Sequence, residues 1–473
     1  MRRIAGKDAI FLYMDTPTNP MHMAFAGVLD PTTVPGGGSG LDLYLRLVDG
    51  LRSRLHLFPP FRQRLVTVPF QLHHPLFIED PTFDLEYHVR RAALPAPGGQ
   101  RELEEFVSDV MSRPMDRSHP LWEMYVVEGV EGGRCAIVAK AHHVIVDGIG
   151  GNEILVNLVD LSPEPREVEP PEREWQPDDV PSDARLLAGA VVANLAQPPR
   201  LVRTVTRTAG KLVQVARERV AGDSELPFAT LGPRTVLNAS VSAQRRVAFG
   251  AVPLEDVKRV KRVLDCKVND VVLAMCGRAL HRFLAAMGDE PDSQLVAAVP
   301  ISIRDGDGED AGNRVAGMTV PLADDEADPV EQLRRIAEST ADAKDAHGAI
   351  TADLMMDWTE FATPALAAQA FRFYSGFQVA RRHRPVANVT ISNVPGPDFP
   401  LYIAGAQLES MYPIGPVVHG QALNVTIVSY RGRMFIGVVA DRGAVPDVAP
   451  LVTEMGKALG ELLEAADAAE GSA

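Results

Sequence analysis

The sequence predicts an α/β fold of two domains with mixed sheets, and three observations lead to this prediction. Apolar runs typical of strands alternate with helical patterns over residues 1–180, and a second alternation begins near residue 234. Between them lie six prolines within 163–181 and a long helical stretch. A chain of 473 residues can hold two or three domains of about 100–200 residues. We therefore expect domains at 1–180 and 234–473, joined by a helical crossover at 181–233.

The end of the first domain is expected to be a strand, a turn and a helix. Residues 135–139 form an apolar run that indicates a buried strand, and a helical apolar pattern follows at 154–159. The proline-rich stretch 163–181 has little apolar periodicity. We expect it to leave the domain over the surface in an extended form.

The crossover is predicted to be helical from about residue 183 to 220, with a break at the proline pair 198–199. Its second half, 200–217, places Arg203, Arg207 and Lys211 on one face and apolar side chains on the other. The simplest interpretation is a helix that packs its apolar face on a domain. The alternative is a helix that docks on an anionic membrane or lipid-droplet surface.

The second domain is again expected to mix helices and strands. The apolar patterns predict a helix at 268–283 and strands at 295–300, 387–391, 423–430 and 434–440. The sequence contains no glycine-rich phosphate loop of the P-loop or dinucleotide type, so nucleotide-loop chemistry is not expected.

Composition limits the function classes further. The chain is 46% hydrophobic and 23% charged, with a formal net charge of −15, which argues against general nucleic-acid binding. Cys135, Cys266 and Cys276 lack the spacing of a disulfide framework or a zinc site, so we expect no metal and a reducing compartment. No segment has the pattern of a secretion signal or a membrane span, and a cytoplasmic location is expected.

The most informative local pattern is HHVIVDG at 142–148, where an apolar strand meets a glycine-containing turn. Side chains alternate along a strand, so His142 and His143 should point to opposite faces, one chemical and the other supportive. An imidazole suits proton removal from an alcohol or amine. Asp147 could shape the turn or pair with a distant arginine. No serine elbow or neighbouring cysteine is present, which favours direct attack without a covalent intermediate.

The paired histidines have two alternative interpretations. They could be structural, and they could bind a metal, although the pattern lacks a third ligand and the spacing of a helical metal site. Placement at a strand end favours the chemical interpretation.

The motif resembles the H-H-x-x-x-D-G signature of CoA-dependent acyltransferases and condensation domains, and other segments narrow the resemblance to the bacterial wax ester synthase/diacylglycerol acyltransferase family. These segments are Pro120-Leu121-Trp122-Glu123, Val268-Asn269-Asp270-Val271 and Asn393-Val394-Pro395-Gly396-Pro397, with Pro20-Met21-His22 and the stretch 415–424 also similar. The resemblance covers nearly the whole chain in order. It implies two related domains like chloramphenicol acetyltransferase, with an active-site tunnel at their interface.

The resemblance also implies roles for the motif residues. His143 would be the general base, with His142 beside it, and Asp147 would be an anchor that pairs with an arginine, for which Arg304 is our choice. Gly148 would let the backbone turn close to the substrate. Asn269 would be an oxyanion donor or orient the substrate; its alternative role is the N-cap of the following helix.

Further residues are assigned to structure or to the tunnel. Pro120, Leu121 and Trp122 are expected in packing and the tunnel wall. Asn393, Pro395 and Gly396 are expected in a rigid loop or at the tunnel rim. His419 is expected to be structural, with a contact to CoA or acceptor as the alternative. The glycine tract 36–40 lies near an N-terminal segment containing Asp15 and His22, where details of the acceptor site are open.

The resemblance implies transfer of a long-chain acyl group from acyl-CoA to diacylglycerol, and also to long-chain alcohols, with acyl-CoA as co-substrate and no other cofactor. The alternatives are a carrier-protein-dependent condensation enzyme and a non-catalytic lipid-binding or droplet protein. Peripheral association with the inner membrane leaflet or lipid droplets would use the 200–217 helix.

Overall fold

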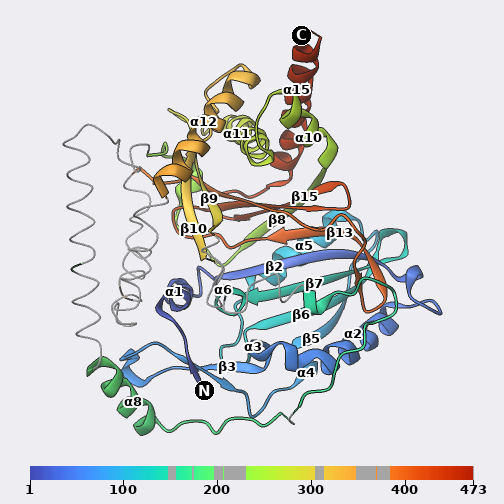
Figure 1. Cartoon of the computed structure of the whole chain (residues 1–473), viewed down its shortest axis with the longest axis vertical. Coiled ribbons are helices and arrows are strands. Elements are labelled where there is room, and N and C mark those ends of the chain that lie inside the picture. Colours follow the sequence, from blue (N-terminus) through green and yellow to red (C-terminus); the bar gives the residue numbers. More distant parts are fainter. Residues whose placement is uncertain are drawn as a thin grey trace.

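The computed structural model describes residues 1–147, 156–172, 175–195, 231–303, 314–347 and 384–471, with residues 206 and 369. In these ranges two six-stranded sheets are stacked with helices around them, next to a smaller three-stranded sheet (Figure 1). Both large sheets mix directions: β5 runs parallel to β6, and β11 runs parallel to β9 and β14. The predicted α/β class with mixed sheets is confirmed.

The first large sheet has the order β12-β13-β2-β7-β6-β5. Its central strands come from the N-terminal part of the chain, whereas β12 and β13 come from far along the sequence and pair against β2. The chain from 234 onward therefore contributes to both large sheets. The strands are β2 (His22–Asp30), β5 (Val89–Ala93), β6 (Trp122–Val130), β7 (Arg134–His142), β12 (Tyr402–Ile403) and β13 (Ala406–Ile414).

The second large sheet has the order β10-β9-β11-β14-β15-β8. It comprises β8 (Arg245–Pro253), β9 (Val296–Ile303), β10 (Arg314–Pro321), β11 (Val389–Val394), β14 (Leu423–Tyr430) and β15 (Arg433–Asp441). Four helices lie on its outer side, in the upper part of Figure 1: α10 (Leu254–Val263), α11 (Val268–Ala286), α12 (Pro329–His347) and α15 (Ala449–Glu470).

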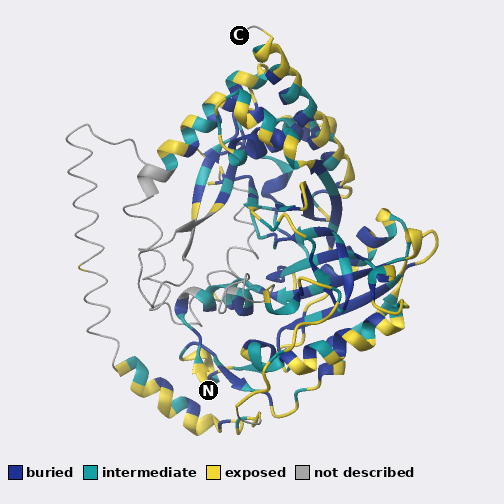
Figure 2. Cartoon of the chain, turned by 45° about the vertical axis from the view of Figure 1, so that its right-hand side comes forward, coloured by how far each residue is buried: buried dark blue, intermediate teal, exposed yellow. Residues whose placement is uncertain are grey.

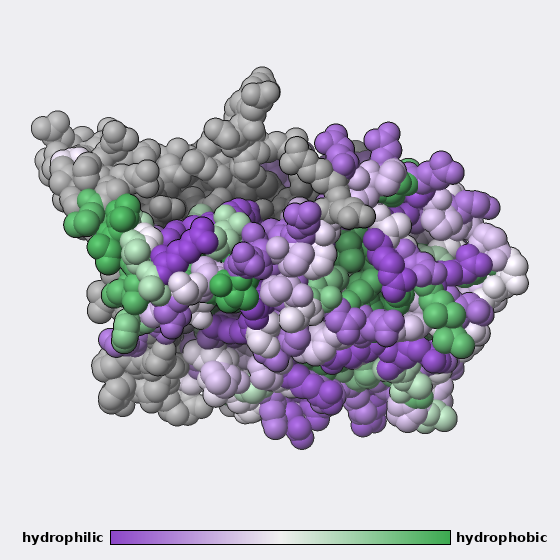
Figure 3. Space-filling view, turned by 90° about the horizontal axis from the view of Figure 1, so that it is seen from below, coloured by the Kyte–Doolittle hydropathy of each residue, from purple (hydrophilic) through white to green (hydrophobic). Residues whose placement is uncertain are grey.

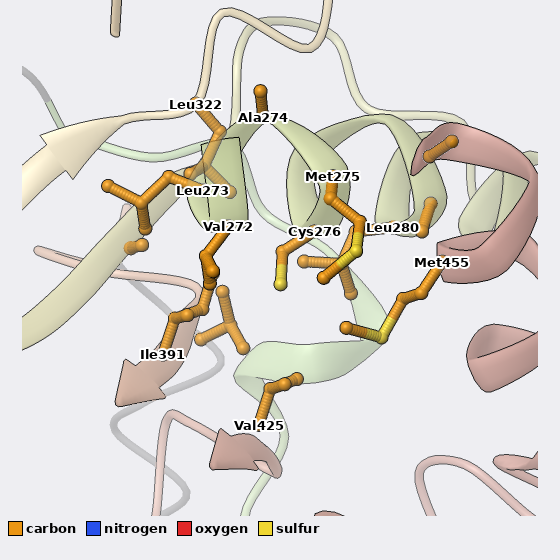
Figure 4. Packing of buried hydrophobic residues seen from close by; sticks show 14 of the residues in the cluster. Val272, Leu273, Ala274, Met275, Cys276, Leu280, Leu322, Ile391, Val425 and Met455 are labelled. Atoms are coloured by element: carbon orange, nitrogen blue, oxygen red, sulfur yellow. The ribbon is translucent and has the colours of Figure 1, made fainter. Parts of the chain in front are cut away.

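The main core lies between this sheet and α11. Val272 and Cys276 of α11 face Ile391 and Val425 of the sheet, and Met455 of α15 closes the cluster (Figure 4). Cys276 is a free thiol, and complete burial raises its pKa to about 12. It packs as a small apolar side chain and is not poised for thiolate chemistry.

The two large sheets approach each other closely where β13 crosses β15. A Cβ atom placed on Gly437 of β15 would lie 1.8 Å from the carbonyl oxygen of Pro413 on β13. Only glycine fits this approach, because any other side chain would push the strands apart.

Helix α5 (Gln100–Ser112) connects the two layers through a polar stripe. Strand β8 is an edge strand, and its backbone N–H groups at residues 245, 247 and 249 donate to Ser112 Oγ (2.8 Å), Ser108 Oγ (2.9 Å) and Glu104 Oε1 (2.7 Å). These acceptors are four residues apart and so share one helix face. The helix thus stands in for a neighbouring strand, because an unpaired buried N–H would cost about 1–3 kcal/mol.

The remaining elements surround the first sheet. The helices are α1 (Gly6–Met14), α2 (Gly40–Arg54), α3 (Pro59–Arg62), α4 (Leu85–His88), α6 (His143–Asp147) and α8 (Asp183–Leu195), with short 3-10 turns between them. The small sheet joins β1 (Arg2–Arg3), β4 (Leu76–Glu79) and β3 (Gln63–Val66). In Figure 2 the sheets are mostly buried, whereas much of α8 is exposed.

Several predicted elements are confirmed. The run 135–139 lies in β7, the helix at 268–283 is α11, and the strands at 295–300, 387–391, 423–430 and 434–440 correspond to β9, β11, β14 and β15. The described parts of 163–181 have no regular structure and are largely exposed. The helix predicted from residue 183 is present as α8, but 200–217, with Arg203, Arg207 and Lys211, lies outside the described residues. No helix in the described ranges is long and apolar enough to cross a bilayer.

Candidate active site

The paired histidines lie where β7 ends and α6 begins. His142 is the last residue of the strand and His143 is the first of the helix. The change of backbone direction separates their surroundings, because the side chain of His142 is 1% exposed whereas His143 is half-buried. The two imidazoles therefore have different surroundings, although the helix start separates them and not the strand alternation that the sequence suggested. Their separate chemical roles stay a prediction.

Both ring nitrogens of His142 are engaged. Nδ1 accepts the backbone N–H of Val144 at 3.1 Å, so the proton of the neutral ring resides on Nε2. Nε2 then donates to Asp15 Oδ2 at 3.2 Å. Burial lowers the pKa of His142, against the opposing effect of Asp15, so the ring is neutral at pH 7. A neutral imidazole with both nitrogens occupied cannot accept a proton from a substrate. The two hydrogen bonds of His142 stabilise the turn instead.

Asp15 follows α1 and ties three parts of the site together. Its Oδ2 accepts from His142 and from Arg117 Nη2 at 2.8 Å, and its Oδ1 accepts the backbone N–H of Met21 at 3.4 Å. Burial alone would raise the pKa of this carboxyl, but the hydrogen bond from His142 and the hydrogen bond and charge of Arg117 outweigh it and lower the pKa to about 2. Asp15 is thus ionised at any working pH.

His143 is held by its backbone and by a ring contact. Its N–H donates to the carbonyl oxygen of Met21 at 3.0 Å. Its imidazole stacks on the phenyl ring of Phe11, with 4.0 Å between centroids and 20° between planes. Nδ1 of His143 is buried. His142 has both ring nitrogens engaged, and the base role expected for His143 stays a prediction.

His22 of β2 lies beside the motif strand. It is paired with His142 in the sheet register, and the two rings meet edge to face with centroids 5.9 Å apart. Burial, followed by the charge of Lys140, holds the pKa of His22 well below its ordinary value, so this ring is neutral. The similarity noted for the segment 20–22 thus falls on residues that support the motif from the next strand.

Lys140, two residues before His142, is also part of this support. Lys140 is 1% exposed, and its ammonium group donates to the carbonyl oxygens of Val110 (2.9 Å) and Arg113 (2.7 Å), at the end of α5. Burial lowers its pKa to about 8. A cation at a helix C-terminus complements the helix dipole, so Lys140 fixes α5 against the strand that carries the motif.

Three predicted site residues cannot be placed. Asp147 ends α6, but its side chain is not described, and Gly148 and Arg304 lie outside the described residues. The predicted pairing of Asp147 with Arg304 therefore stays a prediction.

The alternative role predicted for Asn269 is wrong. Lys267 is the N-cap residue of α11, and Asn269 is the second residue of the helix. The carboxylate of Asp270 accepts the Lys267 N–H at 2.9 Å and a hydrogen bond from Thr340 Oγ1 at 2.8 Å. The acidic residue takes the capping role because its charge suits the first turn of a helix. Asn269 is half-buried, and its expected role as an oxyanion donor or substrate-orienting group stays a prediction.

The residues assigned to packing behave as packing residues. Pro120, Leu121 and Trp122 are buried. Trp122 donates from Nε1 to the carbonyl oxygen of Phe61 at 2.8 Å and stacks on His88 at 4.5 Å. These contacts give Trp122 a packing role at the start of β6, and the expected place of the three residues in a tunnel wall stays a prediction.

The loop after β11 and the loop that holds His419 are also structural. Asn393 lies on β11 opposite Ile427, and Pro395 is exposed. A Cβ atom on Gly396 would lie 2.1 Å from the carbonyl oxygen of Ser429, so only glycine lets this loop cross β14. His419 accepts the backbone N–H of Val241 on Nδ1 at 3.1 Å, which anchors its loop.

A cavity of about 140 Å³ lies beside Asp15 and Arg117. It is smaller than the roughly 300–1,000 Å³ of typical ligand pockets, and His143 is not part of its lining. The interface tunnel is thus still a prediction. The lining residues are Leu12, Tyr13, Asp15, Thr16, Leu65, Thr67, Gln71, His73, Pro75 and Arg117. Within the described residues, no three His, Cys, Asp or Glu side chains gather as a metal site would require.

The chain matches the models of a known protein family and several of its members. The family described as "Wax ester synthase/diacylglycerol acyltransferase catalytic domain" matches residues 4–272, and "WS/DGAT C-terminal domain" matches residues 311–463. Two proteins of Mycobacterium tuberculosis (strain CDC 1551), named provisionally as diacylglycerol O-acyltransferases, are each 35% identical. The alignments cover 99% of this chain and 91% of one relative, and 94% of this chain and 92% of the other.

Two solved structures match the fold over nearly the whole chain. The wax ester synthase/diacylglycerol acyltransferase from Marinobacter aquaeolei VT8 matches with a TM-score of 0.69 and 29% identity, over 98% of this chain and 100% of that one. The first condensation domain of the calcium-dependent antibiotic synthetase matches with a TM-score of 0.52 over 98% of this chain and 96% of that one. At 12% identity this second match shows a shared fold only.

Proposed function

Because the chain belongs to the wax ester synthase/diacylglycerol acyltransferase family, we propose that it transfers a long-chain acyl group from acyl-CoA to the hydroxyl of diacylglycerol, and secondarily to that of a long-chain alcohol. The chain is an acyltransferase. The observation that supports the proposed chemistry is the division of labour between the histidines, since His142 is occupied at both nitrogens and His143 is held so that it can act as a base.

The proposed reaction is a direct displacement. Nε2 of His143 accepts the hydroxyl proton of the acceptor while the acceptor oxygen attacks the thioester carbon of acyl-CoA. The tetrahedral intermediate then breaks its carbon–sulfur bond, and the CoA thiolate takes the proton back from the imidazolium. Atoms and charge balance without a covalent acyl-enzyme. Asn269 is our candidate for a donor to the oxyanion, a role worth roughly 3–4 kcal/mol of barrier in other enzymes.

The proposal is tested by measuring thiol release from palmitoyl-CoA with dipalmitoylglycerol, with hexadecanol, or without acceptor. We expect acceptor-dependent release and formation of triacylglycerol and wax ester, with the ratio of products giving the acceptor preference. Release that occurs only when an acyl-carrier protein replaces acyl-CoA would point to condensation chemistry. A folded protein that binds acyl-CoA and releases no thiol with any acceptor would contradict the proposed activity.

We also propose that the protein meets its water-insoluble acceptor at a lipid surface, through an apolar patch on α8 and the neighbouring turn. Val192 and Leu195 of α8 are 68% and 76% exposed, and Phe70 is 81% exposed at the tip of the turn. The two segments are joined by a hydrogen bond from Asn194 Nδ2 to the carbonyl oxygen of Leu72 (3.1 Å). Figure 3 shows hydrophobic side chains gathered at this end of the molecule. The basic segment 200–217 follows α8 in the chain.

Replacing Phe70, Val192 and Leu195 by serine is expected to weaken binding to vesicles of phosphatidylcholine, phosphatidylglycerol and diacylglycerol at least about 10-fold, because each apolar side chain contributes about 1.5–3 kcal/mol when buried. Sedimentation with the vesicles measures the fraction of protein bound. Turnover of a short-chain, water-soluble acceptor should not change. Leu161→Ser, at a residue 72% exposed, is the control. Equal vesicle binding by the triple variant would exclude the patch. Reversing Arg203, Arg207 and Lys211 to Glu tests the basic segment separately.

A further inference from the structure

The side chain of Phe11 stacks on the proposed base, and Phe11 lies outside the motif. Its phenyl ring lies 4.0 Å from the His143 imidazole, centroid to centroid, and nearly parallel to it. The ring comes from α1, more than a hundred residues before the motif. At this distance the two rings are in direct contact across their faces.

The position of Phe11 is fixed from several directions. Ala9 and Leu12 of the same helix are buried, at 0% and 5% exposed. Past the ring, the backbone N–H of Asp15 donates to the carbonyl oxygen of Phe11 at 3.1 Å, and Arg117 Nη2 donates to that of Leu12 at 3.2 Å. The helix end that carries Phe11 is thus tied to the Asp15 network that also holds His142. A ring held in this way limits rotation of the imidazole stacked on it.

The charge on His143 changes during the proposed reaction. The imidazole is neutral before it accepts the acceptor proton and becomes an imidazolium as the carbon–oxygen bond forms. A cation over the face of an aromatic ring, within about 6 Å of its centroid, is attracted by the negative face of the ring quadrupole. The contact between Phe11 and His143 is therefore stronger in the transition state than in the ground state, which is the condition for an effect on rate.

We propose that Phe11 is a positioning residue that holds the plane of the His143 ring and stabilises the imidazolium formed when His143 accepts the acceptor proton. This inference rests on the proposed function, since it requires His143 to be the base. It differs from a packing role in a measurable way. Packing depends on the size of the ring, whereas the attraction for a cation depends on the electron density of its face.

The test is a series of fluorinated phenylalanines at position 11, with one, two, three and five ring fluorines, in the full-length protein. Fluorine withdraws electron density from the ring face with little change of shape. We expect the single-turnover rate of acyl transfer to fall stepwise with fluorination, by about 2- to 30-fold over the series. KM for acyl-CoA and for acceptor should stay constant, since fluorination weakens the attraction for an imidazolium that forms only after both substrates have bound.

Two controls separate the possible outcomes. Phe106 is a half-buried ring on α5 that meets Tyr125 edge to face, and pentafluorination there should leave the rate unchanged. Phe11→Leu, with folding checked by thermal unfolding, should be at least as slow as the pentafluoro protein. Suppose that the unmodified protein is active, that His143→Ala loses this activity, and that the rate is the same across the fluorinated series. This result would overturn the role of Phe11 and leave the proposed function standing. No acyl transfer by the unmodified protein would overturn both this role and the proposed function.

Discussion

His143→Ala is expected to lower kcat for acyl transfer by about 10²–10⁴-fold, the usual contribution of a general base. The loss should fall on kcat more than on KM, because the imidazole removes a proton in the transition state and does not carry the binding of either substrate. The fold should persist, since the side chain is half-buried and its backbone N–H still bonds to Met21. Steady-state thiol release with palmitoyl-CoA and diacylglycerol, together with circular dichroism, measures both effects.

His142 provides the matched comparison. His142→Ala removes the acceptor for the Val144 N–H and the donor to Asp15, so it should destabilise the protein as well as slow it. His143→Ala should lower turnover with little change in the temperature of unfolding. If the two variants lost stability equally and His143→Ala kept more than a tenth of wild-type turnover, the assignment of the base to His143 would be wrong.

The chemical part of this site could be predicted from the sequence because it is local. His142 and His143 are adjacent, and the alternation of side chains along a strand already indicates that only one of them faces a substrate. The residues that hold them are not local. Asp15 is 127 positions from His142. Neither Phe11 nor Arg117 lies near the motif, and a single phenylalanine or arginine has no spacing from which its partner could be inferred.

The fold shows the same division between local and distant information. Strand β15 contains a continuous apolar run, and β14 has apolar residues interrupted by Asn424, Thr426 and Ser429, so the existence of both strands could be predicted from composition and periodicity alone. The pairing of β13 with β2 joins residues nearly four hundred positions apart. Nothing in either strand specifies that partner, because sheet pairing is decided by the packing of whole layers. The polar stripe on α5 likewise has meaning only once β8 lies beside it.

Asp15→Asn is expected to lower the free energy of unfolding at pH 7 by up to about 2 kcal/mol and to slow acyl transfer about 10- to 100-fold. The stability estimate follows from the pKa of Asp15, which is about 2 in the folded protein against 3.8 for the free side chain. A depressed pKa means that the folded state favours the ionised form. This contribution is therefore complete above about pH 5 and is lost as the pH falls through about 2.

The activity loss has a separate physical cause. An amide at position 15 cannot accept from His142, Arg117 and Met21 together, because one of its two terminal atoms is itself a donor. The lost hydrogen bond would displace the backbone of Met21. The carbonyl oxygen of Met21 accepts the backbone N–H of His143, so the imidazole of the proposed base would lose its alignment. Urea unfolding from pH 3 to pH 7 and kcat at pH 7 measure the two effects. Asp49→Asn, which removes an exposed pair with Arg52, should change neither quantity measurably. If the difference in stability between wild type and Asp15→Asn did not shrink toward pH 3, the carboxylate charge would not be what holds His142.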